Sequence, residues 1–180
     1  MLIDFQTKDG KPLYDYIWDR VYSELGFKPS YDYHGHSMNV PLPFAIKQRY
    51  SVYAIDDMTD VQIDILNKKI PSVLEDITSV GERIYALDWH HSAFLFDPRD
   101  EDDMKSVPSV DEKTGECLGM NYFPAFCPDG DYYFFIAEDF SFGYLGHPWR
   151  QEIWVFGDKL IDRIENEYNS FGWKKIYDKE

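Results

Sequence analysis

The sequence predicts one α+β domain spanning residues 1–180, with a mostly antiparallel central sheet of about five or six strands and three helices packed on it. Apolar residues recur at helical spacing in three segments, which are 13–25, 59–77 and 158–168. Two segments alternate with the two-residue period of a strand, 44–55 and 82–96, and the second is either one long strand or a strand broken in its middle. Two short runs, 132–137 and 152–156, are continuously apolar or aromatic, as in strands buried on both faces.

The helices have recognisable ends. Gly26 follows the first apolar stripe, where a glycine commonly ends a helix. Residues 56–59 are of the types that start a helix and come before the second apolar stripe. Pro71 inside this stripe predicts a kink or two abutting helices, because proline removes a backbone donor and crowds the preceding turn. Gly157 and Asp158 separate the last buried strand from the third helix.

The strand predictions place 132–137 at the centre of the sheet, with 152–156 as the nearest candidate to lie beside it. The residues between these two runs mix acids, small residues and aromatic rings, and they are expected to form a long binding loop. Segment 44–55 has the alternation of a half-buried strand with a basic, polar face. Residues 117–126 predict a short strand, and 171–177 a short edge strand or a segment over the core.

Segment 97–116 is an acidic insertion. It carries eight acids against Arg99, Lys105 and Lys113, a local charge of −5, and almost no large apolar residue. Such a composition buries too little surface to offset the entropy of ordering, so a mobile loop is expected.

The whole chain is acidic and aromatic. Asp and Glu number 33 against 18 Lys and Arg, giving a formal charge of −15, and 18% of the residues are aromatic. This charge repels phosphate backbones and anionic membranes and favours a basic protein partner, so neither a nucleic acid nor a membrane is expected as partner. Solubility alone is the alternative explanation of the charge.

Cys117 and Cys127 do not form a metal-binding or disulfide framework by their spacing, and the first residues lack the pattern of a secretory signal. We therefore expect a reducing, cytoplasmic location and no cofactor.

Two groups of residues suggest metal or acid–base chemistry. Asp32, His34 and His36 alternate along a turn-rich segment and form a weak candidate metal site, since a structural zinc site needs four ligands and no cysteine lies near. A hydrolase would use a second cluster, formed by His90, Glu138, Asp139 and His147. A triad of Asp88, His90 and Ser92 is disfavoured, because same-face residues of one strand lie about 6.5 to 7 Å apart.

A recognition surface is the competing use of this region. Aromatic rings give rigid contact area and nearby carboxylates steer a basic partner. The candidate binding residues are Tyr31, Tyr33, Glu138, Asp139, Phe140, Phe142, Tyr144 and Trp149.

The segments ALDWHHSAFLFDP, CPDGDYYFFIAEDFSFGYLGHPW and IWVFG resemble the bacterial domain-of-unknown-function 2716 family over residues 18–164. The resemblance implies a small cytosolic bacterial protein without an assigned reaction, and it carries over no catalytic residue. By analogy of size and charge, such acidic proteins are similar to immunity proteins or antitoxins. The leading expectation is a non-enzymatic acidic inhibitor that docks on a basic partner, and the alternative is the metal-dependent or acid–base hydrolase. A small-ligand binding module that uses an aromatic cleft is the third possibility.

Overall fold

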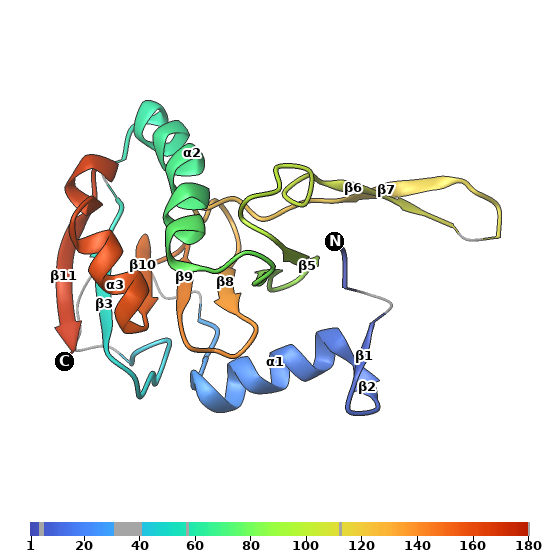
Figure 1. Ribbon diagram of the computed structural model, residues 1–180, viewed down its shortest axis with the longest axis horizontal. Helices are drawn as coiled ribbons and strands as arrows, with labels where there is room; N and C mark the ends of the chain where they lie inside the picture. Colours follow the sequence, from blue (N-terminus) through green and yellow to red (C-terminus); the bar gives the residue numbers. More distant parts are fainter. Residues whose placement is uncertain (4–5, 31–40, 57, 112, 180) are drawn as a thin grey trace.

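The protein is an α+β fold built on one antiparallel sheet, in a computed structural model that describes residues 1–3, 6–30, 41–56, 58–111 and 113–179. Seven strands lie in the order β11-β3-β10-β9-β8-β4-β5, and every neighbouring pair is antiparallel (Figure 1). Their bounds are β3 (Tyr50–Ala54), β4 (Ile84–Asp88), β5 (Ala93–Phe96), β8 (Tyr133–Ala137), β9 (Gly143–His147), β10 (Glu152–Phe156) and β11 (Lys174–Lys179). The predicted fold class is confirmed, with more strands than expected.

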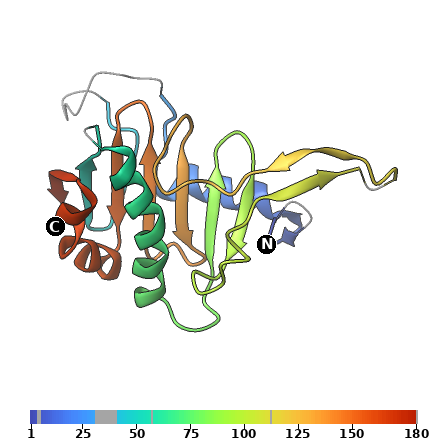
Figure 2. The same ribbon diagram turned by 90° about the horizontal axis from the view of Figure 1, so that it is seen from above.

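Helices cover both faces of the sheet (Figures 1 and 2). On one face lies α1 (Leu13–Glu24), and on the other lie α2 (Asp60–Ile77) and α3 (Asp158–Glu165). The core is correspondingly divided into two clusters, with alternate residues of each strand in different clusters: Trp154 packs on the α1 side and Val155 on the side of α2 and α3. A 3₁₀ turn, Tyr168–Phe171, leads into the edge strand β11.

Helix α2 begins where the sequence predicts. The Thr59 hydroxyl accepts a hydrogen bond from the Gln62 N–H at 3.3 Å, and the Gln62 side chain accepts one from the Thr59 N–H at 2.8 Å. The prediction of two abutting helices is wrong, because one helix runs through Pro71. Its apolar stripe, which includes Leu66, Ile70 and Leu74, is buried on the sheet, and this packing offsets the backbone hydrogen bond that proline removes.

The expected long strand 82–96 is a hairpin. Strand β4 ends at Asp88, residues 89–92 turn, and β5 returns beside it with Leu87 opposite Ala93. The expected binding loop after β8 is also corrected, because its second half is β9, which lies between β8 and β10. Segment 44–55 forms a strand only from Tyr50, and β3 is buried on both faces, with Val52 in the core cluster on the α1 side and Tyr53 in the cluster on the side of α2 and α3.

Outside the main sheet are two small ribbons. One joins β1 (Thr7–Lys8) to β2 (Lys11–Pro12), and the other joins β6 (Val107–Val110) to β7 (Cys117–Asn121). The second ribbon projects far from the body of the molecule, as Figure 2 shows; residues 106–122 are called the arm here. Part of the acidic insertion is therefore a strand, β6, because it pairs with the short strand that the sequence predicts at 117–126.

None of the helices within the described ranges combines the length and the apolar character needed to cross a membrane.

Candidate functional site

The turn between β4 and β5 brings two histidines and an aspartate to one end of the sheet. The Asp88 N–H donates to the Ser92 carbonyl at 2.8 Å, and the His91 N–H donates to the Asp88 carbonyl at 3.3 Å. These bonds close the chain tightly within four residues, Trp89 to Ser92. As a result the His90 and His91 side chains are exposed at the turn, while Asp88 is buried beneath it, with 6% of its surface accessible.

A second buried carboxylate reaches the turn from a distant part of the chain. Strands β4 and β8 are antiparallel with Asp88 opposite Tyr133, so the residues just before β8 lie beside the turn. The Trp89 N–H donates to the Tyr132 carbonyl at 3.2 Å, which ties the two segments together. Asp131 thereby lies against the histidines, also only 6% exposed, with one oxygen accepting from the Tyr132 N–H at 2.7 Å.

Each carboxylate is paired with an imidazole. The Nδ1 atom of His90 lies 2.7 Å from Asp131 Oδ2, and Nδ1 of His91 lies 2.9 Å from Asp88 Oδ1 and 3.8 Å from Asp131 Oδ2. Burial raises the pKa of the Asp88 carboxyl, an effect opposed by the His91 hydrogen bond and reinforced by the Asp131 charge. The bond to Asp88 in turn raises the pKa of His91. A positive charge beside the two buried carboxylates therefore stabilises the cluster.

A cavity of about 660 Å³ opens next to this cluster. Its lining joins the hairpin turn, the base of the arm and the start of β8: Asp88, His91, Met120, Asn121, Tyr122, Phe123, Ala125, Asp129 and Tyr133. The base of the arm is fixed here, since the Ser92 hydroxyl donates to the Tyr122 carbonyl at 2.6 Å and the Phe123 ring packs on Phe94 at 5.3 Å.

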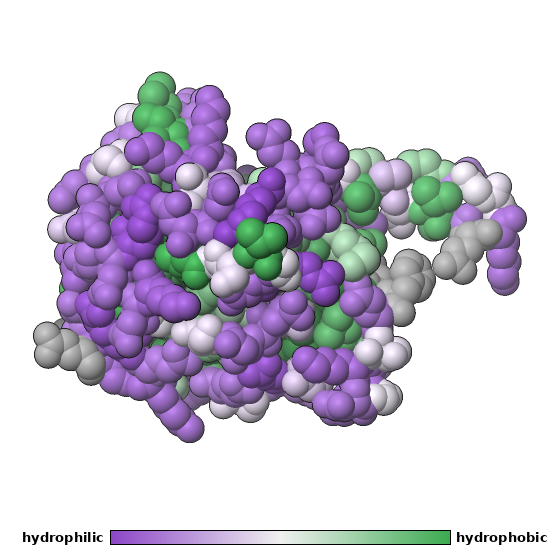
Figure 3. All heavy atoms as spheres, viewed as in Figure 1, coloured by the Kyte–Doolittle hydropathy of each residue, from purple (hydrophilic) through white to green (hydrophobic). Residues whose placement is uncertain are grey.

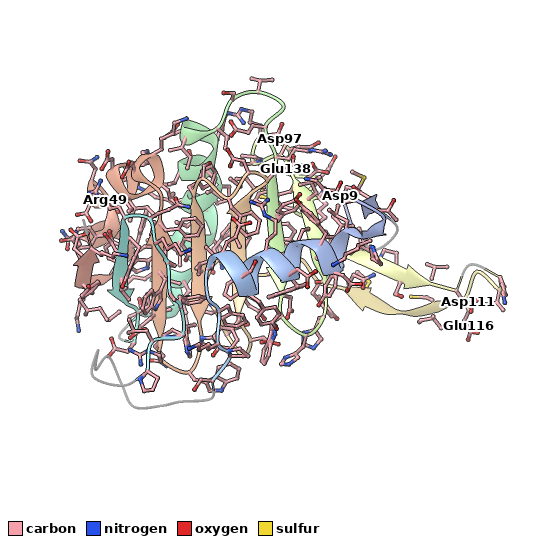
Figure 4. The ribbon with its side chains drawn as sticks, turned by 90° about the horizontal axis from the view of Figure 1, so that it is seen from below. Asp9, Arg49, Asp97, Asp111, Glu116 and Glu138 are labelled. Atoms are coloured by element: carbon pink, nitrogen blue, oxygen red, sulfur yellow. The ribbon has the colours of Figure 1, made fainter. Side chains whose placement is uncertain are left out.

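Beyond its base the arm carries exposed apolar side chains, which we call the arm surface. Its members and exposed fractions are Val110 (47%), Leu118 (66%), Met120 (43%) and Tyr122 (67%). Figure 3 shows hydrophobic residues along the projecting arm. Acidic residues lie at both ends of the arm: Asp111 and Glu116 near its tip, labelled in Figure 4, and the 97–103 segment before its base.

The hydrolase cluster expected from the sequence does not assemble. His90, in the β4–β5 turn, lies beside the start of β8. Glu138 and Asp139 follow the end of β8, roughly 20 Å away for a strand of this length. The Arg20 guanidinium donates to the Glu138 carbonyl at 3.1 Å and to the Asp139 carbonyl at 3.4 Å, so this turn is attached to α1. The four proposed catalytic residues therefore do not share one site.

His147 is fully buried at the end of β9. Its Nδ1 accepts from the Arg150 N–H at 3.3 Å, so Nε2 carries the proton and donates to the Tyr132 hydroxyl at 3.2 Å. Burial, with a smaller effect from the Arg150 charge, lowers the pKa of His147 to about 3. It is a structural histidine held neutral.

The neutral state of His147 predicts a pH dependence. Between its lowered pKa of about 3 and the ordinary value near 6.5, the unfolded imidazole binds a proton that the folded one excludes, so stability falls as pH falls through this range. The contribution approaches about 1.4 kcal/mol per pH unit for one group. Urea unfolding at pH 6 and at pH 4.5 should show a shallower loss for His147→Asn than for the wild type. Equal losses would contradict the neutral assignment.

Three of the six rings expected on a docking surface are in the core. Phe140, Phe142 and Tyr144 are 2%, 3% and 1% exposed, which corrects the expectation that they lie at the surface. Trp149 is half-buried against the Tyr132 ring, 5.1 Å between centroids. The remaining candidates lie outside the described residues: Tyr31, Tyr33 and the weak metal group Asp32, His34 and His36.

Two features escaped the sequence interpretation. Asp131 was not singled out, although it follows a turn signal and precedes a buried strand, where a polar residue at a sheet end is a candidate for function. The arm surface also lacks a sequence signal, because the pattern predicts a loop and a separate short strand there rather than one paired ribbon.

The described chain thus defines an α+β protein with a seven-stranded antiparallel sheet, an aspartate–histidine cluster at one sheet end and a projecting arm. Residues 10–161 match the family described as protein of unknown function (DUF2716), and the chain belongs to this family. It is 33% identical over 157 residues to the uncharacterized protein YxiI of Bacillus subtilis (strain 168), an alignment that covers 85% of this chain and 88% of the relative. No solved structure matches.

Proposed function

We propose that this protein is an acidic, cytoplasmic binding protein of the immunity or antitoxin type, which docks on a basic partner protein through the arm surface. The observation that supports it most is the exposure of Val110, Leu118, Met120 and Tyr122 together on one projecting ribbon. An isolated two-stranded ribbon is only marginally stable in water, and an exposed apolar patch on a monomer commonly marks a binding surface.

Charge selects the kind of partner. The chain carries −15 overall, and acids lie at both ends of the arm. A second copy of the chain would bring the same charge to the interface and be repelled, whereas a basic partner would be attracted over a Debye length of about 8 to 10 Å at moderate salt. The arm surface then makes the contacts from which water is excluded, and the carboxylates increase the rate of association by attracting the basic partner. Inhibition follows if the covered region of the partner is its basic active site.

The two cysteines support the cytoplasmic part of the proposal. Cys117 is free and exposed, and Cys127 is free and buried. Free thiols persist in a reducing compartment.

Site-specific photo-crosslinking in the native host tests the docking proposal. A photoreactive residue at Tyr122 should capture one discrete protein with an excess of Lys and Arg, whereas the same residue at Val61, equally exposed at 67% but on α2, should not. Expression of the captured protein alone should arrest growth, and co-expression of this chain should restore it. Capture of an acidic protein, or equal capture from both positions, would contradict the proposal.

The purified pair then gives a quantitative prediction. Tyr122→Ser and Leu118→Ser should each weaken binding at least tenfold, because each removes a large side chain from the contact, while Val61→Ser leaves affinity unchanged. All three side chains are exposed, so thermal unfolding should change little and separate lost binding from lost folding. Raising the salt concentration should slow association with the wild type. An affinity that both arm variants retain would exclude the arm surface.

A further inference from the structure

We propose that Asp88, His91 and Asp131 form a binding site for one divalent transition-metal ion such as Zn²⁺. This site lies at the base of the arm and is separate from the docking proposal above. One donor atom from each of the three residues lies within 4.8 Å of the other two. The ligand set comes from three places: the end of β4, the turn that follows it and the residue two before β8.

The distances suit a small ion. Ligand atoms that bind Zn²⁺ at about 2.0 to 2.2 Å in a tetrahedral arrangement lie roughly 3.4 Å from one another. The His91 Nδ1 atom is 2.9 Å from Asp88 Oδ1 and 3.8 Å from Asp131 Oδ2, so these two separations bracket that value. The remaining separation, between the two carboxylates, is within 4.8 Å, so side-chain adjustment can bring the three donor atoms onto one ion.

The burial of the two carboxylates favours a cation beside them. Both are 6% exposed, and removing two neighbouring acids from water is costly unless positive charge lies beside them. The imidazoles that now meet them are on a surface turn, with His91 having 68% of its side chain exposed. Neighbouring groups hold Asp131 in place, since the Tyr132 N–H donates to one of its oxygens and His90 Nδ1 is hydrogen-bonded to the other. Supporting bonds of this kind orient metal ligands.

The chemistry of the donors selects the class of metal. One imidazole and two carboxylates suit Zn²⁺, Mn²⁺ or Co²⁺, whereas Mg²⁺ and Ca²⁺ prefer a shell made of oxygen alone. Asp88 and His91 also line the cavity of about 660 Å³, so an ion held between them would border this cavity and be accessible to water or to an oxygen of a small ligand. Three protein ligands with one open position are typical of reactive rather than purely structural zinc sites.

Metal titration of the full chain tests this proposal. After treatment with chelator, isothermal titration with Zn²⁺ should show roughly one ion bound per chain, and Mg²⁺ should bind at least tenfold more weakly. His91→Gln and Asp131→Asn should each weaken Zn²⁺ binding at least tenfold. His91 is exposed, so His91→Gln should keep its fold by circular dichroism even where Asp131→Asn does not. Visible absorption of the Co²⁺-loaded protein should change in His91→Gln.

Two controls decide where an ion binds. Asp129→Asn alters another carboxylate of the same cavity outside the three-residue group and should leave Zn²⁺ affinity unchanged. The double variant His34→Gln/His36→Gln removes the histidines of the weaker sequence candidate and should also bind normally. Loss of Zn²⁺ from this double variant with retention in His91→Gln would overturn the proposal, as would a wild type that binds no Zn²⁺. Tyr122→Ser should retain the metal, so failure of the docking proposal is distinguishable from failure of this one.

Discussion

Glu152→Gln is expected to lower the free energy of unfolding by about 3 to 5 kcal/mol, although it removes no heavy atom from the core. Glu152 is fully buried and accepts two hydrogen bonds from Arg150, from Nε at 2.8 Å and from Nη2 at 2.9 Å. One of its oxygens also accepts from the Trp154 indole at 2.9 Å. The substitution replaces the carboxylate by a neutral amide, so the buried guanidinium charge of Arg150 loses the negative charge beside it.

The matched control is the exposed pair Arg49–Asp162, whose Nη1–Oδ1 distance is 2.7 Å. Water screens this pair, so Asp162→Asn should cost no more than about 1 kcal/mol. The double variant Arg150→Met/Glu152→Gln removes both buried charges and keeps an oxygen for Trp154, so it should recover part of the loss. Urea unfolding of all three variants measures these differences. A cost for Glu152→Gln no larger than that of Asp162→Asn would contradict the importance of burial.

Gly157→Ala is the second substitution with a large expected effect, about 3 kcal/mol or more of lost stability. Gly157 joins β10 to α3 with φ +89°, a conformation that strains a residue with a side chain. An added Cβ would also lie 2.4 Å from the Ser141 carbonyl oxygen and 2.8 Å from Phe142 Cα. Because these are backbone atoms between two buried strands, they cannot move aside without disturbing the sheet.

Gly81 separates the two causes. Its φ is +85°, close to that of Gly157, but nothing lies within 4 Å of an added Cβ. Gly81→Ala therefore carries the backbone strain alone, about 1 to 2 kcal/mol. The difference between the two variants in urea unfolding reports the steric clash at Gly157. Equal losses in both would show that the contact with Ser141 is relieved at no cost.

The aspartate–histidine cluster and the arm surface meet at the cavity, since Met120 and Tyr122 line it together with Asp88 and His91. A partner seated on the arm surface would lie next to an ion bound by the cluster. The two proposals are independent, however, because zinc binding is measured on the free protein and docking is measured with side chains that are not metal ligands.

Local patterns were sufficient for the helices and several strands. The stripes of α1, α2 and α3 and the buried runs of β8 and β10 are signalled by residues within each element, whereas the sequence leaves β11 open between an edge strand and a segment over the core. Strand β9 was missed because Gly143 and Gly146 interrupt its apolar pattern. The second glycine is close to Pro128, and the first faces the Phe156 ring, so their lack of side chains serves packing rather than a turn.

The sequence allows a break in the middle of segment 82–96 but does not indicate the chain reversal that makes the hairpin β4–β5. Its turn, Trp89 to Ser92, contains no glycine, proline or asparagine, and side-chain bonds of Asp88 with His90 and His91 stabilise it instead. Once the chain reverses there, the antiparallel pairing of β4 with β8 places the histidines beside Asp131 rather than beside Glu138 and Asp139.

The sequence by itself determined the α+β class, the helices, the acidic charge and the presence of two histidines in a polar segment, because each depends on residue types and spacings along the chain. Only the tertiary structure decided which acids meet those histidines and which rings face water. Both depend on strand pairing and on the choice of sheet face, and strand pairing can join residues far apart in the chain, such as His90 and Asp131, which are 41 positions apart.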